Sequence, residues 1–408
     1  MRAEGTYATS CSRMIHSIFQ IIALLGCLSS GLYYLLVLWS AAAFLRESKA
    51  DRDCEADKSV RPTRPLPPVS ILKPLKGTDP DIYESFRSYC RQDYPEYEII
   101  FGVSDPDDSA VASVRRLQQE FPGHAIRLAV VPKILGANVK VSNLAQMLAE
   151  ARYEYLLVND SDIRVEPDYL RRVIAPLGDN SVGLVTCLYR AVPAPSLGSR
   201  LEALGISTDF CPSVLAARQL EGGIRFGLGS TLAFRRADLK RIGGFESFVD
   251  FLADDYELGR RISALGLRVV LSDVVVETHL PAYDLRGFLD HQLRWARGVR
   301  DARTGGYIGL VSTYGLMWAL LAVIAAHAAP WSWAVFGVTV LLRLAVALAV
   351  GKSALQDSHL LKNLWLLPLR DLVAVAVWIA SFAGHTVTWR GDRFELKNGR
   401  LIRIAPQD

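Results

Sequence analysis

The sequence lacks charged side chains over several long stretches, and this absence excludes an ordinary soluble protein. Met14–Leu45 contains no Asp, Glu, Lys or Arg, and neither does Gly305–Leu342. Half of the 408 residues are hydrophobic and the mean hydropathy is +0.19, which is high for a soluble chain of this size. Each stretch is long enough to cross a bilayer. We therefore predict an integral, multi-pass membrane protein.

The expected spans are one N-terminal and about three C-terminal. Residues 14–45 form the transmembrane anchor. The alternative, a cleaved signal peptide, is disfavoured because the apolar run is too long and no small-x-small cleavage site follows it. Residues 305–389 form the C-terminal transmembrane region, which breaks at Ala329-Pro330-Trp331 into a hairpin of two spans. Leu372–Trp389 is the third candidate.

Cysteine is scarce, and its spacing indicates neither a metal site nor a disulfide framework. Six cysteines occur with no C-x-x-C pair, which argues against a zinc site or a disulfide framework and fits a reducing compartment. A P-loop and a dinucleotide fingerprint are also missing, since the glycine-rich turn Arg225–Thr231 fits neither pattern. The net charge of +4 is small for this length and gives no reason to expect nucleic acid as a partner.

Charges beside the apolar stretches predict the orientation in the membrane. Only Arg2 and Arg13 precede the first span, whereas residues 46–68, a predicted stiff linker, carry six Lys or Arg. The positive-inside rule then places the large middle region, residues 69–304, in the cytoplasm. Residues 390–408 form a basic tail that three C-terminal spans would put outside. Either one C-terminal segment is re-entrant or interfacial, or the tail is translocated.

The middle region alternates strand and helix patterns, which predicts a doubly wound α/β domain with a largely parallel sheet. Apolar strand candidates alternate with helical spacing along the chain. The expected strands are Val69–Leu72, Tyr97–Val103, Ala125–Val131, Tyr155–Val158, Val182–Tyr189, Leu232–Phe234 and Val269–Val276. The expected helices are Asp79–Cys90, Ala110–Phe121, Gly136–Ala151, Pro167–Ala175, Leu197–Leu220, a helix from Asp254 to Leu265, and Asp284–Arg300.

Carboxylates follow two of these strands. Asn159-Asp160-Ser161-Asp162 comes directly after Tyr155–Val158, and Asp105-Pro-Asp-Asp108 follows Tyr97–Val103. Ligands of open α/β sheets bind at the carboxyl ends of strands. Asp160 and Asp162 can therefore share a divalent cation, Mg²⁺ or Mn²⁺, on a nucleotide diphosphate. The alternative is an Asx-turn in which both side chains bond only to local backbone.

Six motifs in order carry a resemblance to a known family. They are Val69-Ser-Ile-Leu-Lys-Pro-Leu-Lys-Gly77, Val103-Ser-Asp-Pro-Asp-Asp108, Asn138-Val-Lys-Val-Ser-Asn-Leu144, Asn159-Asp-Ser-Asp-Ile-Arg-Val165, Ala253-Asp-Asp-Tyr256 and His291-Gln-Leu-Arg-Trp295. The chain resembles the ceramide glucosyltransferase family, membrane-bound GT-A glycosyltransferases that include a bacterial group acting on hopanoids. The resemblance covers about residues 69–308. It implies a GT-A type nucleotide-sugar-binding domain flanked by transmembrane helices.

The resemblance also implies roles for individual residues. Asp108, with Asp105 beside it, matches the aspartate near the nucleotide, and Lys76 and Lys140 are candidate phosphate contacts. Asp160 matches the second aspartate, and Asp162 completes the metal pair. The general base that deprotonates the acceptor matches Asp255. The final motif supplies the remaining catalytic candidates, in which His291 stands where relatives have Gln or Arg: His291, Arg294 and Trp295.

The implied reaction is inverting transfer of a hexose, glucose or N-acetylglucosamine, from a UDP-sugar to a membrane-lipid hydroxyl. Ceramide and a hopanoid side chain are both open as acceptors. A polysaccharide synthase of the same fold is disfavoured because about four spans make a thin channel for a polymer. A non-catalytic lipid-binding scaffold is the alternative from a different class, and the ordered carboxylates argue against it.

Overall fold

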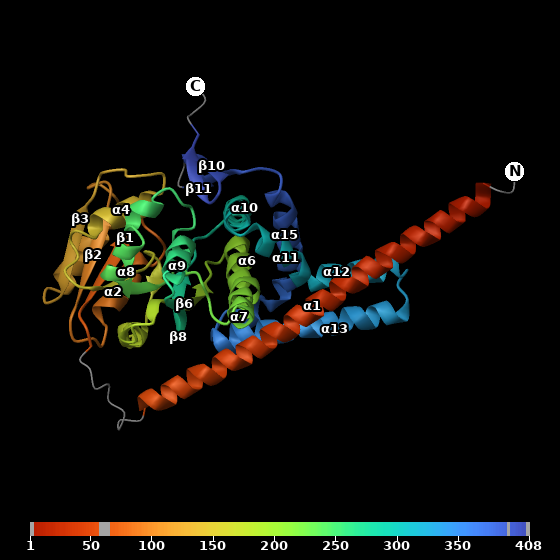
Figure 1. Ribbon diagram of the computed structural model, residues 1–408, viewed down its shortest axis with the longest axis horizontal. Helices are drawn as coiled ribbons and strands as arrows, with labels where there is room; N and C mark the ends of the chain where they lie inside the picture. The colour runs from red at the N-terminus through yellow and green to blue at the C-terminus, as the bar shows by residue number, and fades with distance from the viewer. Residues whose placement is uncertain (1–3, 57–65, 390–391, 405–408) are drawn as a thin grey trace.

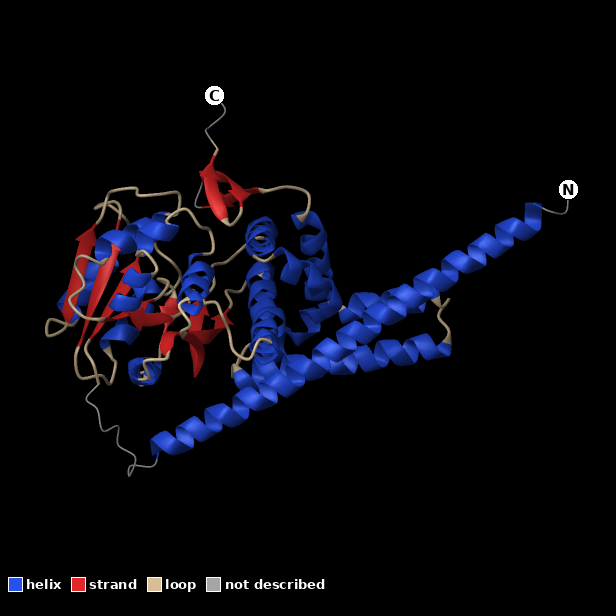
Figure 2. Ribbon diagram, viewed as in Figure 1, coloured by secondary structure: helices blue, strands red, loops and turns tan. Residues whose placement is uncertain are grey.

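The computed structural model describes residues 4–56, 66–389 and 392–404, and it divides into an α/β part and a helical part. In Figure 1 the strands lie at the left, and the long α1 (Glu4–Ala56) runs diagonally beneath the molecule to the far right. Figure 2 shows that helices fill the space between the large sheet and the free end of α1.

One eight-stranded sheet forms the α/β part, in the order β3-β2-β1-β4-β7-β6-β8-β5. Its strands are β1 (Val69–Pro74), β2 (Tyr97–Val103), β3 (Ala125–Val130), β4 (Tyr155–Val158), β5 (Ile163–Arg164), β6 (Val182–Val192), β7 (Leu232–Arg235) and β8 (Arg268–His279). The first four are parallel neighbours. β1, β2 and β4 are short apolar runs that are buried or nearly so, as expected for strands covered on both faces, whereas β3 at the edge of the sheet is partly exposed.

The sheet is largely parallel, as predicted, but two of its strands are reversed: β7, which lies inside the sheet, and the short edge strand β5. β7 pairs antiparallel with both β4 and β6, and β5 pairs antiparallel with β8, while β6 and β8 are parallel. The helices that precede β7 do not form a crossover back over the sheet. β7 therefore enters between β4 and β6 in the reverse direction, and the carboxyl end of β4 lies beside the start of β7.

Apart from Arg236–Arg241, which is not among the predicted helices, the helices of the α/β part agree with the expected ranges to within a few residues, with one exception. They are α2 (Ile82–Cys90), α3 (Ala110–Glu120), α4 (Val139–Met147), α5 (Tyr169–Ile174), α8 (Arg236–Arg241), α9 (Asp254–Ala264) and α10 (Leu285–Ala302), with short 3₁₀ turns η1 (Ala175–Gly178) and η3 (Phe245–Phe248). The exception is the expected helix Leu197–Leu220. It is divided into α6 (Leu197–Gly205), a π-helical turn η2 (Ile206–Phe210) and α7 (Cys211–Leu220).

α1 is longer than the predicted anchor and packs on the rest of the protein along one stripe. Its buried positions include Ser30, Tyr34, Val37, Ala41, Phe44 and Ser48, at alternating spacings of three and four. The C-terminal half of α1 thereby joins the main hydrophobic core. The helix continues to Ala56, so the first part of the predicted linker 46–68 is helical, and residues 57–65 lie outside the described residues.

The C-terminal helices are α11 (Thr304–Gly309), η4 (Leu310–Thr313), α12 (Gly315–Ala325), α13 (Pro330–Val346), π-helical η5 (Ala347–Ala354), α14 (Leu360–Asn363), η6 (Leu364–Leu366) and α15 (Leu367–Ser381). Within the described ranges, three helices are long and apolar enough to cross a membrane: His16–Ala50, Pro330–Ala354 and Leu360–Ser381. Thr304–Thr313 and Gly315–Ala325 add a fourth only if this pair, bent by 54°, is one span. By length and composition, two C-terminal helices therefore qualify where about three were expected.

The predicted third C-terminal span, Leu372–Trp389, is wrong at its end. The helix stops at Ser381, and Gly384 follows with a φ of +154° that ends helical geometry. Thr386–Trp389 then forms strand β9, in keeping with its β-branched residues. β9 pairs with β10 (Asp392–Lys397), which pairs with β11 (Arg400–Arg403), so most of the predicted basic tail is a small antiparallel sheet.

Candidate functional site

The site lies at the carboxyl end of β4, where the chain passes from buried strand to polar loop. Asn159 is fully buried, and its amide donates to the hydroxyl of Tyr169 at 2.8 Å and to the carbonyl of Ser230 at 2.6 Å. The loop after β4 is thereby attached to α5 and to the turn before β7. Asp160, the next residue, is held at the surface with its side chain 42% exposed.

Lys140 joins the predicted carboxylate Asp160 to a second one, Asp254, that was not among the predicted site residues. Its ammonium lies 2.8 Å from Asp160 Oδ1 and 3.1 Å from Asp254 Oδ2. Asn138 caps the helix that carries this lysine, accepting from the N–H of Val141. Burial alone would lower the pKa of Lys140, but the charges of Asp160 and Asp254 outweigh it and the pKa is raised. The lysine therefore stays cationic between the end of β4 and the start of α9.

Asp255 completes this cluster beside Gly229. The Asp255 Oδ2 atom accepts a 2.8 Å hydrogen bond from the N–H of Gly229, and Oδ1 accepts from the N–H of Tyr256. A methyl group at Gly229 would lie 3.0 Å from Asp160 Oδ2 and 3.4 Å from Asp255 Oδ2, so the two carboxylates converge on this glycine. Burial and the charge of Asp254 raise the pKa of Asp255 to about 6, although Lys140 opposes this shift.

Asp162 points away from the cluster. Its Oδ2 atom accepts a 2.5 Å hydrogen bond from Thr278 on β8. Burial and the charge of Asp160 raise the pKa of Asp162 to about 6. The Asp-x-Asp pair is therefore divided. Asp160 faces Lys140 and Gly229, and Asp162 anchors the loop to the neighbouring strand.

Lys73 supports the same loop from below and was not among the predicted site residues. It is fully buried, donates a 3.0 Å hydrogen bond to the carbonyl of Asp160, and lies 3.9 Å from the centre of the Tyr89 ring. Burial lowers the pKa of Lys73 to about 7, against the opposing charges of Asp162, Asp160 and Asp79. A fully buried lysine is rare unless it is paired. The sequence alone does not show that Lys73 is buried, because its burial depends on how the strand packs.

The carboxylates after β2 hold loops together. Both oxygens of Asp108 accept from the N–H of Gly77, at 3.0 and 2.9 Å, and Oδ1 also accepts from the N–H of Ala110 at the start of α3. Asp105 accepts from the N–H of Asp107, as in an Asx-turn. The structure therefore gives Asp108 the role of joining the β1 and β2 loops, and Lys76 lies exposed next to that junction.

The His-x-x-Arg-Trp motif lies on α10, in an aromatic group between α10 and η2. His291 stacks on Tyr283 with ring centres 5.4 Å apart, and Trp295 meets Phe210 edge-on at 5.8 Å. Trp295 is 37% exposed, so one side of the indole is open. Arg294 precedes it on the same helix and is partly buried.

Glu202 of α6 lies behind this motif and was also missed. Its carboxylate is 3% exposed, lies 3.4 Å from His291 Nδ1, and accepts a 2.8 Å hydrogen bond from Gln292. The predicted site thus separates into three groups. The first is the carboxylate and lysine cluster at β4 and α9, the second is the aromatic and basic motif on α10, and the third is Asp105, Asp108 and Lys76 at the β1 and β2 loops.

A divalent cation fits the donor chemistry of the first group. No three His, Cys, Asp or Glu side chains in the described residues are arranged to hold a metal among themselves. Mg²⁺ and Mn²⁺ on a nucleotide need only one or two protein carboxylates, because phosphates and water supply the other oxygens. Asp160 is half exposed and free of the bond that engages Asp162, so it is the better oxygen donor.

Residues 22–402 match glycosyl transferase family 21. Two similar proteins of Caenorhabditis elegans are ceramide glucosyltransferase 1, 23% identical over 95% of this chain and 82% of its own, and ceramide glucosyltransferase 3, 25% identical over 83% and 74%. A mannosyltransferase from Pyrobaculum calidifontis, solved with GDP-mannose and Mn²⁺, superposes with a TM-score of 0.51 at 22% identity, over 85% of this chain and 99% of that one.

Proposed function

The chain belongs to glycosyl transferase family 21, and we propose that it transfers a hexose from a UDP-sugar to the hydroxyl of a membrane lipid, ceramide in the first instance. The convergence of Lys140, Asp160 and Asp255 beside Gly229 carries this proposal. An ammonium and two carboxylates meet there at the carboxyl end of a strand, where α/β proteins bind nucleotides, which supports their use as phosphate contact, metal ligand and base. Two relatives aligned along most of the chain are ceramide glucosyltransferases, which favours ceramide as acceptor.

The donor would bind with its diphosphate between Asp160 and the α10 motif. A divalent cation held by Asp160 would neutralise the phosphates, and the Mn²⁺ bound by the solved mannosyltransferase supports this assignment. Lys140 adds a second positive charge next to Asp160. Arg294 offers a guanidinium for the leaving diphosphate, and the open side of the Trp295 indole offers a surface for sugar or acceptor.

Asp255 would act as the general base. Inverting transfer is one displacement, in which the acceptor oxygen attacks the anomeric carbon, loses its proton to a carboxylate, and the nucleoside diphosphate leaves. A pKa of about 6 leaves Asp255 mostly ionised at neutral pH but more basic than an ordinary aspartate. Its bond from Gly229 aims Oδ2 toward Asp160, so the base and the metal-binding carboxylate would face the same substrate.

A radiolabelled transfer assay tests this function. Membranes containing the chain are incubated with labelled UDP-glucose or UDP-N-acetylglucosamine, a divalent cation, and ceramide or a hopanoid as acceptor. Label that enters the organic phase only with ceramide supports the proposal, and mass spectrometry then identifies a hexosylceramide. If label enters the organic phase only with the hopanoid, the acceptor is a hopanoid and not ceramide. Label retained in a water-soluble or insoluble polymer would refute lipid transfer.

A further inference from the structure

The α14–α15 segment (Leu360–Ser381) has the length and apolar composition of a membrane span, but it packs along the polar helix α10. We propose that this segment does not cross the bilayer. It lies along the membrane surface, with its outer apolar face in the lipid, on the same side of the membrane as the catalytic domain. Three observations carry this proposal: the face it exposes, the helix it packs against, and the return of the chain after it.

The segment exposes one apolar face, and its buried positions include charged and polar side chains among apolar ones. Its exposed large apolar side chains fall within an arc of roughly 140° at 100° per residue. They are Leu361, Trp365, Leu369, Leu372, Ile379 and Phe382. Asn363 and Arg370 lie on the opposite face and Asp371 at the side, and all three are buried together with Leu360, Leu366 and Leu367. An apolar outer face with tryptophan, backed by charged residues, is the pattern of a helix lying in the interface.

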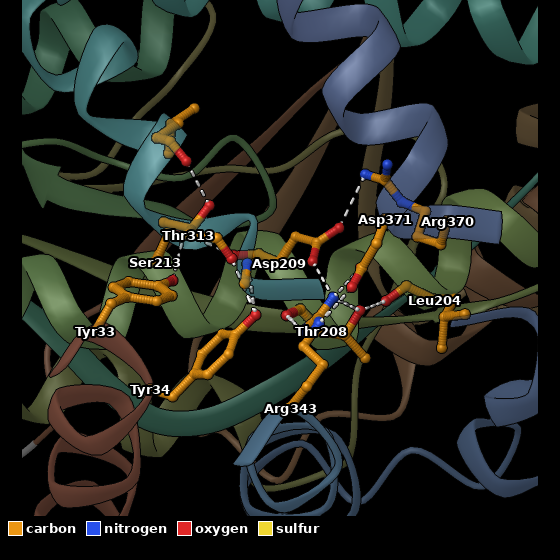
Figure 3. A network of polar contacts seen from close by, with 12 residues as sticks. Tyr33, Tyr34, Leu204, Thr208, Asp209, Ser213, Thr313, Arg343, Arg370 and Asp371 are labelled. Atoms are coloured by element: carbon orange, nitrogen blue, oxygen red, sulfur yellow. Dashed lines mark hydrogen bonds and ion pairs between the residues drawn. The ribbon is translucent and has the colours of Figure 1, made fainter. Parts of the chain in front are cut away.

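The buried face is attached to the protein by charge. Arg343 of α13 bonds Asp371 at 2.6 and 3.1 Å and Asp209 of η2 at 2.6 Å. Arg370 lies 3.2 Å from the other oxygen of Asp209. Figure 3 shows these side chains from α13, α15 and η2 pointing at one another, with Tyr33 and Tyr34 of α1 beside them. These ion pairs therefore fix the segment against α13 and η2, beside the part of α1 that joins the main core.

The helix beside α15 cannot enter hydrocarbon. α10 runs alongside α15, since Arg370 donates to Gln292 at 3.1 Å near one end, and Arg300 donates to the carbonyls of Ser381 and Gly384 near the other. α10 carries exposed Arg286 and Asp290 as well as the Arg294-Trp295 pair. A transbilayer α15 would draw this polar helix into the lipid, and burying ionised side chains there is costly.

The chain after α15 returns to the catalytic domain. Two backbone hydrogen bonds join the β10–β11 hairpin to residues before α9. Leu252 donates to the carbonyl of Gly399 at 3.1 Å, and Leu401 donates to the carbonyl of Asp250 at 2.6 Å. These bonds fasten the C-terminal sheet to the loop before α9. The sheet and the catalytic domain must share one side of the membrane, so the C-terminal region crosses an even number of times. Where the bent pair Thr304–Thr313 and Gly315–Ala325 is one span, this pair and Pro330–Ala354 go out and come back, and an in-plane α14–α15 segment keeps the count even.

This arrangement resolves the conflict between three C-terminal spans and a basic tail. Arg393, Lys397, Arg400 and Arg403 stay with the catalytic domain and need not be translocated. Packed helices lie about 8–10 Å apart, so α10 is held one helix diameter from the bilayer surface. The open side of Trp295 would then lie at the depth where a membrane lipid presents its hydroxyl.

Two measurements on the full-length chain in vesicles test the proposal without relying on activity. Cys11, Cys27 and Cys54 are first replaced by serine, since Cys90, Cys187 and Cys211 are buried. Single exposed cysteines are then placed at Arg152 in the catalytic domain and at Lys397 in the tail sheet. A membrane-impermeant maleimide should label both from the same face. Labelling of the two from opposite faces would overturn the proposal.

Depth measurements give the second test. Nitroxides at Leu361, Leu372 and Ile379 are compared by their exposure to oxygen and to a water-soluble nickel chelate. An in-plane helix gives all three the same shallow depth. A span would put Leu361 and Ile379, about 27 Å apart along a helix, near opposite surfaces with Leu372 deeper than either, which would contradict the proposal. Trp333 and Leu341 on exposed positions of α13 serve as controls and should differ from each other in depth.

Discussion

Lys140 forms an ion pair with Asp160 at 2.8 Å, and this pair links the start of α4 to the end of β4. The same ammonium also reaches Asp254, whose side chain is only 11% exposed. Removing the charge leaves two carboxylates close together with no cation between them. The lysine thus supports both the charge balance of the site and its ability to accept a diphosphate.

Lys140→Met should therefore weaken donor binding about tenfold or more, equivalent to about 1.4 kcal/mol, and lower the free energy of unfolding by about 1–3 kcal/mol. Calorimetric titration with the UDP-sugar and thermal unfolding in detergent measure the two effects. Lys240→Met, an exposed lysine on α8, is the matched control and should change neither. Unchanged donor affinity in Lys140→Met would remove this lysine from the site.

The division of the Asp-x-Asp pair predicts unequal effects of two similar changes. Asp160→Asn should weaken Mn²⁺ binding in the presence of UDP at least tenfold, because it removes the charge of the exposed oxygen donor. Asp162→Asn should change Mn²⁺ binding less than threefold, because an asparagine oxygen can still accept from Thr278. Electron paramagnetic resonance of free Mn²⁺ measures both. Equal losses in the two variants would restore Asp162 as a metal ligand.

The raised pKa of Asp255 predicts how kcat/KM falls at acidic pH. Its pKa is raised to about 6, so it keeps its proton to a higher pH than an ordinary aspartate, and a protonated carboxyl cannot act as a base. kcat/KM should therefore fall about tenfold per pH unit below pH 6 and level off above pH 7. Asp255→Asn should lower turnover at least a thousandfold while leaving UDP binding and membrane insertion intact. A limb centred near pH 4, or activity in the asparagine variant, would show that another group is the base.

Gly229 is the site residue whose replacement acts by volume alone. In Gly229→Ala the new methyl group would stand 3.0 Å from Asp160 Oδ2 and 3.4 Å from Asp255 Oδ2, in the space between the two carboxylates. We expect kcat to fall roughly ten- to a hundredfold with little change in thermal stability, since displacements of about 1 Å at a reacting centre are this costly. Gly178→Ala, where a methyl group would meet nothing within 4 Å, is the control. Wild-type turnover in Gly229→Ala would mean that the substrate does not use this space.

The strands and most helices of the α/β part could be predicted because local pattern decides them. Tyr97–Val103 and Tyr155–Val158 are apolar runs ended by polar clusters, and both strands occur with those bounds. The reversed direction of β7 could not be predicted, because it depends on which strands β7 lies between and not on its own four residues. The π-helical turn at Ile206–Phe210 likewise arises where tertiary contacts oppose a regular helix.

Among the site residues, Asp160 and Asp255 come together as the motifs suggested, whereas Lys73 carried no signal of its own. The run Ser-Ile-Leu-Lys-Pro predicts a strand that ends just before the lysine. Only the packing of β1 against Tyr89 shows that this lysine is buried. The sequence places the end of the last helix at Trp389, too far along the chain, because residues 382–389 remain apolar in composition. Their glycine and β-branched residues favour the strand that the tail sheet requires.

The tail sheet predicts a link between the C-terminus and the catalytic loop. Asn398 and Gly399 form the β10–β11 turn with φ of 54° and 79°, a two-residue hairpin turn that favours Asn-Gly. Gly399 bonds Leu252, and the same loop bonds the start of α4, through Asp250 to the N–H of Ala137 and through the carbonyl of Phe251 to Asn138. The loop therefore lies between the helices that carry Lys140 and Asp255.

Gly399→Val should loosen this link. A β-branched residue at a φ of +79° is strained by about 1–3 kcal/mol, and its Cβ would lie 3.2 Å from the Phe251 ring. We expect protease cleavage in the tail to become faster and kcat to fall about three- to thirtyfold, while vesicle insertion stays the same. Gly123→Val, in an open loop away from the site, is the control. A tail that is released while kcat stays at the wild-type value would show that the sheet is only a cover, with no part in holding α4 and α9 in register.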